Sequence, residues 1–326
     1  MTTSQQIRLR HVQANGIRMQ IAEVGAGPLV VLCHGFPECW YSWRQQMLFL
    51  AEAGYHAVAP DMRGYGGTDA PAEIDQYTIF HLVGDVMGLL DALKAPRAVI
   101  IGHDWGAPVA WHCALLRPDR VRAVAGLSVP YFPRTPTRPS TAMPRNEAEE
   151  FYQLYFCQEG QAEAEFDHDI RQSLRDLSYL WSGDNPDNTA RHLSMVQIGS
   201  GMLRGRTAPA AMPAWVSDAD LDVYVSAMQQ HGFRGPLNWY RNIDRNWELT
   251  AAWSGAQIRV PALYMVGERD VLMHFKGMDR LVPALEKVIP NLRTKHIVPG
   301  CGHWIQRERP REVNDAILAL LQSLDD

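Results

Sequence analysis

The side chains in this sequence that could carry out covalent chemistry lie in short motifs flanked by glycine. The most informative is Gly-His-Asp-Trp-Gly at residues 102–106, which follows the apolar run Val99–Ile101. Asp104 therefore lies where a strand would end and a helix would begin near Trp105. A tight turn at such a point lifts one side chain above the edge of a sheet, a layout called a nucleophile elbow. The motif marks Asp104 as a candidate nucleophile.

An aspartate at this position narrows the chemistry. A serine would need a base to remove its proton before it attacks. A carboxylate, with an ordinary pKa of about 3.9, is already an anion at neutral pH and can form an ester by displacing a leaving group at a saturated carbon. That ester must then be hydrolysed, and a histidine can activate the water. The alternative is that Asp104 only caps the following helix, but its place between two glycines after an apolar strand favours the nucleophile.

A second motif, His-Gly-Phe-Pro at residues 34–37, directly follows the strand-like run Leu29–Cys33. In this arrangement the loop faces the elbow and supplies a backbone N–H to an oxyanion hole. We expect the N–H groups of Phe36 and Trp105 to hold the negative oxygen that appears when water attacks the Asp104 ester. Each motif alone is short, but their order along the chain makes the pair informative.

Two further motifs supply an acid and a base. Gly-Glu-Arg-Asp at residues 267–270 follows an apolar strand, and Gly-Cys-Gly-His-Trp at residues 300–304 follows the next strand. The resulting order is Asp104, Asp270, His303, which is the order of nucleophile, acid and base that this architecture requires. Asp270 would accept the imidazole N–H while His303 takes a proton from water. Among 12 histidines, His303 is distinguished by its glycine-flanked loop and its place after the acid.

The elements that must position these motifs are strands alternating with helices. β-Branched apolar runs bounded by Gly, Pro or Asp indicate buried strands of a parallel sheet. These runs lie at Ile7–Val12, Arg18–Val24, Leu29–Cys33, His56–Pro60, Ala98–Ile101, Ala123–Val129, Ala262–Val266 and Lys295–Val298. Apolar residues at spacings of three and four predict helices after Trp40 and after Ile79, and others over Met273–Leu285 and Arg311–Leu324. The fold class predicted is therefore α/β, with a mostly parallel eight-stranded sheet flanked by helices.

The alternation stops in the middle of the chain. Four prolines between Tyr131 and Pro144 exclude a regular helix or central strand and indicate a linker. The segment from there to about Trp253 is helical in pattern, with no convincing strand. We therefore expect a core formed by residues 1–130 and 254–326, interrupted by an inserted helical cap of residues 131–253.

Composition excludes several classes of function. The net charge is -5 and no basic cluster occurs, so binding to nucleic acid is not expected. The start of the chain is polar and the apolar runs are strand-length, which argues against a signal peptide and a membrane span. The five cysteines form no C-x-x-C pair, so neither a disulfide framework nor a zinc site is expected. A cytoplasmic protein, monomeric or homodimeric, is the expectation.

From Ile7 to Leu324 the sequence resembles the soluble epoxide hydrolases of the α/β-hydrolase superfamily. The motifs at residues 34–37, 102–106 and 302–304 are similar, as is the loop Arg-Gly-Tyr-Gly-Gly-Thr at residues 63–68. Segments 151–156 and 237–242 resemble the two cap segments that carry the family's epoxide-binding tyrosines. The resemblance implies Tyr152 and Tyr240 as hydrogen-bond donors. The first of the two segments departs slightly from the more common family sequence, which has an acidic residue before the tyrosine. It also implies a substrate site lined by His34, Pro37, Trp105 and Gln153.

The implied reaction converts an epoxide and water to a vicinal diol. An epoxide opens readily only if its oxygen receives a hydrogen bond or a proton, and phenols with a pKa of about 10 are suitable donors. The segment 131–253 contains six tyrosines, and spacing alone does not distinguish among them: Tyr131, Tyr152, Tyr155, Tyr179, Tyr224 and Tyr240. No metal or organic cofactor is implied. Methionines and aromatic residues in the segment suggest an adaptable, apolar pocket for a small hydrophobic epoxide.

Two other functions use the same motifs. A haloalkane or haloacid dehalogenase also has an aspartate at the elbow, and Trp105 could contact a halide. A departing halide needs no proton, however, so paired phenols would have no role. A non-catalytic protein that binds a small molecule on the same fold is less favoured, because nucleophile, acid, base and both donors are all present.

Overall fold

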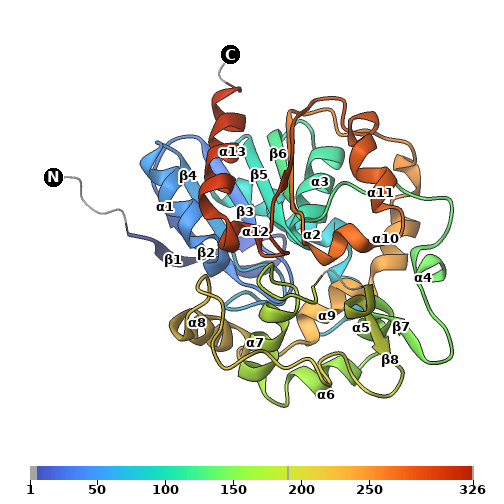
Figure 1. The fold of residues 1–326 in the computed structure, drawn as a ribbon. Helices are drawn as coiled ribbons and strands as arrows, with labels where there is room; N and C mark the ends of the chain where they lie inside the picture. Colours follow the sequence, from blue (N-terminus) through green and yellow to red (C-terminus); the bar gives the residue numbers. More distant parts are fainter. Residues whose placement is uncertain (1–5, 189–190, 325–326) are drawn as a thin grey trace.

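The computed structural model describes residues 6–188 and 191–324, and within these ranges one large sheet forms the centre of the molecule (Figure 1). Its eight strands are β1 (Arg8–Ala14), β2 (Ile17–Val24), β3 (Leu29–Cys33), β4 (His56–Pro60), β5 (Ala98–His103), β6 (Val121–Leu127), β9 (Ala262–Gly267) and β10 (Leu292–Val298). Their order in the sheet is β1-β2-β4-β3-β5-β6-β9-β10. β2 is antiparallel to its neighbours β1 and β4, and the remaining pairs are parallel. The predicted mostly parallel eight-stranded sheet is confirmed.

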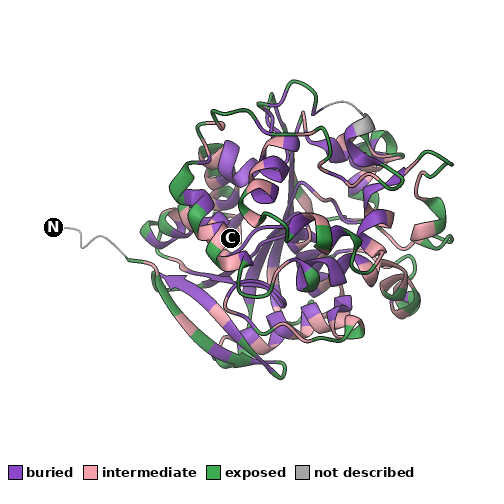
Figure 2. Cartoon of the chain, turned by 90° about the horizontal axis from the view of Figure 1, so that it is seen from below, coloured by how far each residue is buried: buried purple, intermediate pink, exposed green. Residues whose placement is uncertain are grey.

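Helices cover both faces of this sheet because the side chains of each strand alternate between them. In β5, Val99 and Ile101 pack in a cluster with α1 (Arg44–Glu52) and α13 (Pro310–Gln322). Ile100 points to the opposite face, which is covered by α2 (Ile79–Ala92) and α3 (Gly106–Leu116). The strands are consequently buried on both faces, as the purple centre of Figure 2 shows. No helix in the described ranges is both long enough and apolar enough to cross a membrane.

The parallel strands β3, β5, β6 and β9 all end at one edge of the sheet. The loops that follow them therefore lie next to one another, although they are distant in sequence. These loops contain residues 34–37, 104–105, 128–129 and 268–270. The sheet brings the predicted oxyanion loop, nucleophile and acid to one place.

Between β6 and β9 the chain forms a separate set of short elements, seen at the lower edge of Figure 1 and rising at the right. They are α4 (Pro139–Ala142), β7 (Glu149–Phe151), α5 (Tyr152–Cys157), α6 (Gln161–Phe166), α7 (Ile170–Leu180), a 3₁₀ helix (Arg191–Ser194), β8 (Met195–Gln197), α8 (Asp218–Met228), α9 (Arg234–Arg241), α10 (Ile243–Leu249) and a 3₁₀ helix (Ala251–Trp253). The segment is mainly helical, as predicted. The proline-rich linker contains only the single turn α4, with Pro139 at its first position, where a missing N–H is tolerated.

The expectation that this segment holds no strand is wrong. β7 and β8 form a small antiparallel sheet in which Phe151 pairs with Met195. Each strand is three residues long, too short for an alternating pattern to be visible in the sequence.

The predicted continuous helix over Met273–Leu285 is also wrong. The chain there forms a 3₁₀ helix (Val271–His274), the short α11 (Met278–Leu281) and a second 3₁₀ helix (Val282–Lys287). Gly277 interrupts the first two pieces with a φ of +92°, a left-handed conformation that ends a helix. Pro283 has no N–H to donate within the next turn. The apolar spacing was helical, but these two residues break the helix.

Candidate active site

The turn that carries Asp104 is a strained elbow between β5 and α3. Asp104 has a φ of +49°, a left-handed conformation that is uncommon for residues other than glycine. The turn is also too tight for side chains on either side. A Cβ at Gly102 would lie 2.0 Å from the carbonyl oxygen of Gly106, and a Cβ at Gly106 would lie 2.0 Å from that of Cys33. Both glycines are therefore required for the elbow to form.

The two carboxylate oxygens of Asp104 have different surroundings. Oδ1 accepts a hydrogen bond from the backbone N–H of Phe36 at 2.7 Å. Oδ2 lies 3.4 Å from Nε2 of His303. A Cβ at Gly35 would be 2.3 Å from Oδ1 and 2.6 Å from the backbone nitrogen of Trp105, so both predicted oxyanion donors border this carboxylate. The hydrogen bond to Phe36 holds Oδ1 and leaves Oδ2 on the side of the imidazole.

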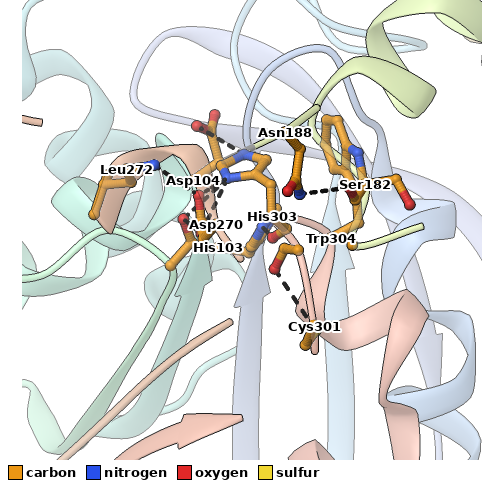
Figure 3. Close-up of polar contacts among 12 residues, drawn as sticks. His103, Asp104, Ser182, Asn188, Asp270, Leu272, Cys301, His303 and Trp304 are labelled. Carbon is orange, nitrogen blue, oxygen red and sulfur yellow. Dashed lines mark hydrogen bonds and ion pairs between the residues drawn. The ribbon is translucent and has the colours of Figure 1, made fainter. Parts of the chain in front are cut away.

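The predicted acid and base are in contact on the other side of the imidazole. Nδ1 of His303 lies 3.2 Å and 3.3 Å from the two carboxylate oxygens of Asp270. Asp270 is fully buried and also accepts the N–H of Leu272 at 3.0 Å. Figure 3 shows the imidazole of His303 between Asp104 and Asp270. The three residues chosen from their motifs therefore lie together in the order that the sequence predicted.

The charges around His303 determine its protonation. Burial disfavours the imidazolium, but the carboxylates of Asp270 and Asp104 outweigh this effect and raise the pKa of His303 to about 10. Burial alone would raise the pKa of Asp270, yet the charge of His303 and the hydrogen bonds that Asp270 receives keep it below its ordinary value. His303 is therefore an imidazolium at neutral pH in the free protein.

Tyr152 and Tyr240 bring two phenols from the segment between β6 and β9 to the elbow. Tyr152 is the first residue of α5, and Tyr240 lies in α9. Their ring centroids are 6.2 Å apart, and the ring of Tyr240 stands edge-on to that of Trp105 at 5.2 Å. Burial, followed by the negative charge of Asp104, raises the pKa of both phenols. Both therefore remain protonated at neutral pH and can donate hydrogen bonds beside the candidate nucleophile.

Other tyrosines of the segment have different partners. The hydroxyl of Tyr155 donates to Glu165 at 2.9 Å, and that of Tyr131 donates to the carbonyl oxygen of Ala256 at 3.2 Å. The ring of Tyr224 lies under the guanidinium of Arg307. These three tyrosines therefore have partners of their own, whereas Tyr152 and Tyr240, which the sequence could select only by resemblance, lie near Asp104.

The residues expected to line a substrate site have contacts of different kinds in the structure. Nε2 of His34 accepts the N–H of Met62 at 3.0 Å, and its Nδ1 donates to the carbonyl oxygen of Gly35 at 3.0 Å. His34 therefore has no free polar atom for a substrate, and the geometry gives it a role in holding the oxyanion loop. Gln153 donates to the hydroxyl of Tyr152 at 3.2 Å. Pro37 lines a small cavity with Glu38 and Tyr224.

Several residues that support this site were not found from the sequence. Nε2 of His103, the neighbour of Asp104, donates to the carbonyl oxygen of His303 at 2.8 Å, and its Nδ1 lies 3.0 Å from the buried carboxylate of Glu38. Ser128, which the sequence placed inside a strand, instead contacts both Asp270 and His303. No local motif signals these contacts, since each joins residues far apart in the chain.

The segment between β6 and β9 lies directly against the loop that holds His303. The N–H of His303 donates to the carbonyl oxygen of Trp181 at 2.9 Å. The carboxylate of Glu308 accepts the N–H of Gly183 at 3.1 Å, that of Gly302 at 2.8 Å and that of Trp304 at 3.2 Å. The approach is so close that a Cβ at Gly302 would lie 2.1 Å from the nitrogen of Gly183. The backbone around His303 is therefore fixed in part by the segment between β6 and β9.

Neither a metal site nor a disulfide occurs among the described residues. No group of three or more His, Cys, Asp or Glu side chains there is arranged to hold a metal ion. The five cysteines are free thiols, and burial raises the pKa of Cys33 to about 12.

Comparison with known proteins shows what this arrangement is similar to. Residues 28–173 match the family described as "alpha/beta hydrolase fold". Epoxide hydrolase A of Mycobacterium tuberculosis is 43% identical over 320 residues, covering 97% of this chain and 98% of that protein. The solved structure of an epoxide hydrolase from an endophytic Streptomyces has a TM-score of 0.94 and 43% identity, covering 98% of this chain and 96% of the other. Epoxide hydrolase A from Mycobacterium thermoresistibile gives a TM-score of 0.90 and 45% identity, covering 97% of this chain and 98% of that one.

Proposed function

The chain belongs to the epoxide hydrolases of the α/β-hydrolase fold, and on that premise we propose that it opens an epoxide through an ester formed on Asp104. One observation carries this proposal. The carboxylate of Asp104 has one oxygen held by the N–H of Phe36 and the other beside His303, with the phenols of Tyr152 and Tyr240 nearby. An anionic nucleophile, a base and paired hydrogen-bond donors are the groups that this reaction needs.

In the first step the phenols of Tyr152 and Tyr240 hydrogen-bond the epoxide oxygen. Oδ2 of Asp104 attacks one ring carbon, because Oδ1 is held by Phe36. The carbon–oxygen bond of the ring breaks and its electron pair stays on the epoxide oxygen, which takes a proton from one phenol. The product is a hydroxyalkyl ester of Asp104, with one tyrosine as its phenolate.

In the second step the ester is hydrolysed with His303 as the base. Esterification removes the negative charge of Asp104, one of the two charges that raise the pKa of His303. The imidazolium then loses its proton to the phenolate, and neutral His303 can accept a proton from water. The resulting hydroxide attacks the carbonyl carbon of Asp104, and the N–H groups of Phe36 and Trp105 stabilise the oxyanion. The tetrahedral intermediate releases the diol, which takes the proton from His303. The carboxylic acid left on Asp104 then gives its proton to the imidazole, which restores the carboxylate and the imidazolium of the free enzyme.

Single-turnover hydrolysis of styrene oxide in heavy-oxygen water tests this route. Because water attacks the carbonyl carbon of Asp104, the first diol should carry an oxygen from the enzyme, and the label should enter Asp104. Later turnovers should yield labelled diol as the carboxylate exchanges. Full label in the diol of the first turnover would show direct attack of water on the epoxide and would reject the ester.

Tyr240→Phe and Tyr152→Phe should each slow ester formation about tenfold to a hundredfold, since each removes one donor to the epoxide oxygen. The double variant should lower the rate of ester formation about 10³-fold or more. Rapid-quench measurement of the ester with excess enzyme gives this rate directly. Tyr155→Phe is the matched control, because the hydroxyl of Tyr155 bonds Glu165 instead. A loss in Tyr155→Phe equal to that in the other variants would contradict the assignment.

We also propose the domain organisation, the substrate class, the location and the assembly of the protein. Residues 131–253 would form a cap over a core of residues 1–130 and 254–326, because the cap supplies both phenols and the core supplies the remaining groups. The aromatic neighbours of Tyr152, namely Trp181 and Phe275, favour a small hydrophobic epoxide. Five free cysteines support a cytoplasmic location. A monomer or homodimer remains the expected assembly.

A further inference from the structure

Ser128 lies immediately after β6, between the strands that lead to Asp104 and to Asp270. Both its backbone N–H and its carbonyl oxygen make hydrogen bonds to residues of the neighbouring strand β9. The N–H of Ser128 donates to the carbonyl oxygen of Met265 at 2.8 Å, and its carbonyl oxygen accepts the hydroxyl of Tyr264 at 2.8 Å. Because β9 is also the strand that leads to Asp270, Ser128 and the acid are held by the same strand.

The hydroxyl of Ser128 lies between the acid and the base. Oγ donates to Oδ2 of Asp270 at 2.6 Å and lies 3.0 Å from Nδ1 of His303. The carboxylate oxygens of Asp270 are farther from Nδ1, at 3.2 Å and 3.3 Å. A hydroxyl has one hydrogen to donate and lone pairs with which to accept. It can therefore donate to Asp270 and accept the N–H of His303 at the same time.

Ser128 adopts a backbone conformation that is uncommon for serine. Ser128 has a φ of +69°, which glycine adopts without strain and other residues rarely adopt. The serine side chain is nevertheless fully buried and makes two contacts within the site. Strained residues of this kind gather at functional sites, and the two contacts of the hydroxyl give a reason for serine at this position.

We propose that Ser128 is a positioning residue for the base. It links His303 to Asp270 through its hydroxyl, fixing the proton of the imidazole on Nδ1 and leaving Nε2 free to take a proton from water. The inference rests on the proposed function, because it concerns the same site and the step in which the ester is hydrolysed. No role for Ser128 in ester formation is implied.

The charge balance around His303 gives the expected direction of a pH effect. The groups that face His303 or bond its loop come from several elements, and they are Asp104, His103, Asp270, Glu308 and, through His103, Glu38. A substitution at Ser128 leaves all of these in place. It removes a hydrogen bond that helps to keep the pKa of Asp270 low. The negative charge of Asp270 then acts more strongly on the imidazolium, which favours the charged form. The N–H on Nδ1 loses Oγ as an acceptor but keeps the carboxylate of Asp270 at 3.2 Å. The first effect therefore outweighs the second, and His303 should lose its proton only at higher pH.

The test compares Ser128→Ala with Ser128→Gly in single-turnover reactions, with the enzyme in excess over styrene oxide. Both variants lack the hydroxyl. Alanine keeps the strain that a left-handed φ imposes on a side chain, whereas glycine adopts the same conformation without strain, so glycine is the variant expected to fold most readily. Ester decay, followed by rapid quench and mass spectrometry, should be about tenfold slower in both, the loss expected from one hydrogen bond to a charged group. The pH at which ester decay reaches half its maximum should rise by about half a unit or more in both. Ester formation should change less than about twofold, since Ser128 contacts neither Asp104 nor the phenols.

Tyr264→Phe provides a third, milder variant, because it removes the hydroxyl that fixes the carbonyl of Ser128. We expect a smaller shift in the same direction. Recovery of normal ester decay in Ser128→Gly would show that only the backbone mattered and would overturn the inference, as would decay with unaltered rate and pH dependence in both variants. Failure of the wild-type protein to form an ester on Asp104 is a different outcome, which would instead reject the proposed function.

Discussion

Asp104→Ala is expected to lower the turnover of styrene oxide by at least about 10⁴-fold, because the substitution removes the only group in the proposed mechanism that bonds to substrate carbon. The Phe36 N–H would lose its acceptor, and the charge that faces both phenols would disappear. Steady-state diol formation measures the loss, and thermal unfolding establishes that the variant is folded.

The matched control for this variant is Asp119→Ala. Asp119 is an exposed carboxylate paired with Arg117 on the surface, where an ion pair contributes little. Its removal should leave turnover within about twofold of wild type. Retention of more than about a tenth of normal turnover in Asp104→Ala would show that another group attacks the epoxide.

His303→Gln should separate the two steps of the reaction. Attack by Asp104 does not need the imidazole as a base, whereas hydrolysis of the ester does, so the ester should accumulate. General base catalysis contributes about 10²- to 10⁴-fold, and steady-state turnover should fall by that factor. Intact-protein mass spectrometry after mixing with styrene oxide should show the added mass of one substrate, located by digestion on the peptide that contains Asp104.

His231→Gln is the control for general effects of losing a histidine, because His231 is exposed after α8. It should show neither added mass nor reduced turnover. Slow turnover of His303→Gln without any added mass would mean that His303 is needed before or during ester formation, and the division of roles between Asp104 and His303 would have to be abandoned.

The sheet and the three residues at its edge were predictable because each depends on local sequence. β3 and β4 have the bounds predicted from their apolar runs, since a strand buried on both faces must be apolar throughout. Asp104 lies between two glycines of its motif for a steric reason, since a Cβ at Gly102 would lie 2.0 Å from the carbonyl oxygen of Gly106. The acid and base then followed from their order along the chain.

The support around those residues was not predictable because it depends on tertiary contacts. Ser128 looked like part of a strand, and its left-handed φ and its contacts with Asp270 appear only when β6 and β9 are adjacent. The pairing of His103 with Glu38 joins residues 65 positions apart. His34 occurs in a motif that suggested substrate binding, yet its ring nitrogens are both bonded to backbone groups.

The contact between Gly183 and Gly302 limits how this enzyme can be recombined with its relatives. A chimaera that takes residues 131–253 from one parent and the rest of the chain from another would join two backbones that meet without room for a methyl group. Grafts should therefore exchange residues 181–183 and 300–308 as one unit, so that the carbonyl of Trp181 and the carboxylate of Glu308 come from the same parent. Grafts that divide this unit should lose ester hydrolysis first, even where the transplanted pocket still admits the new substrate.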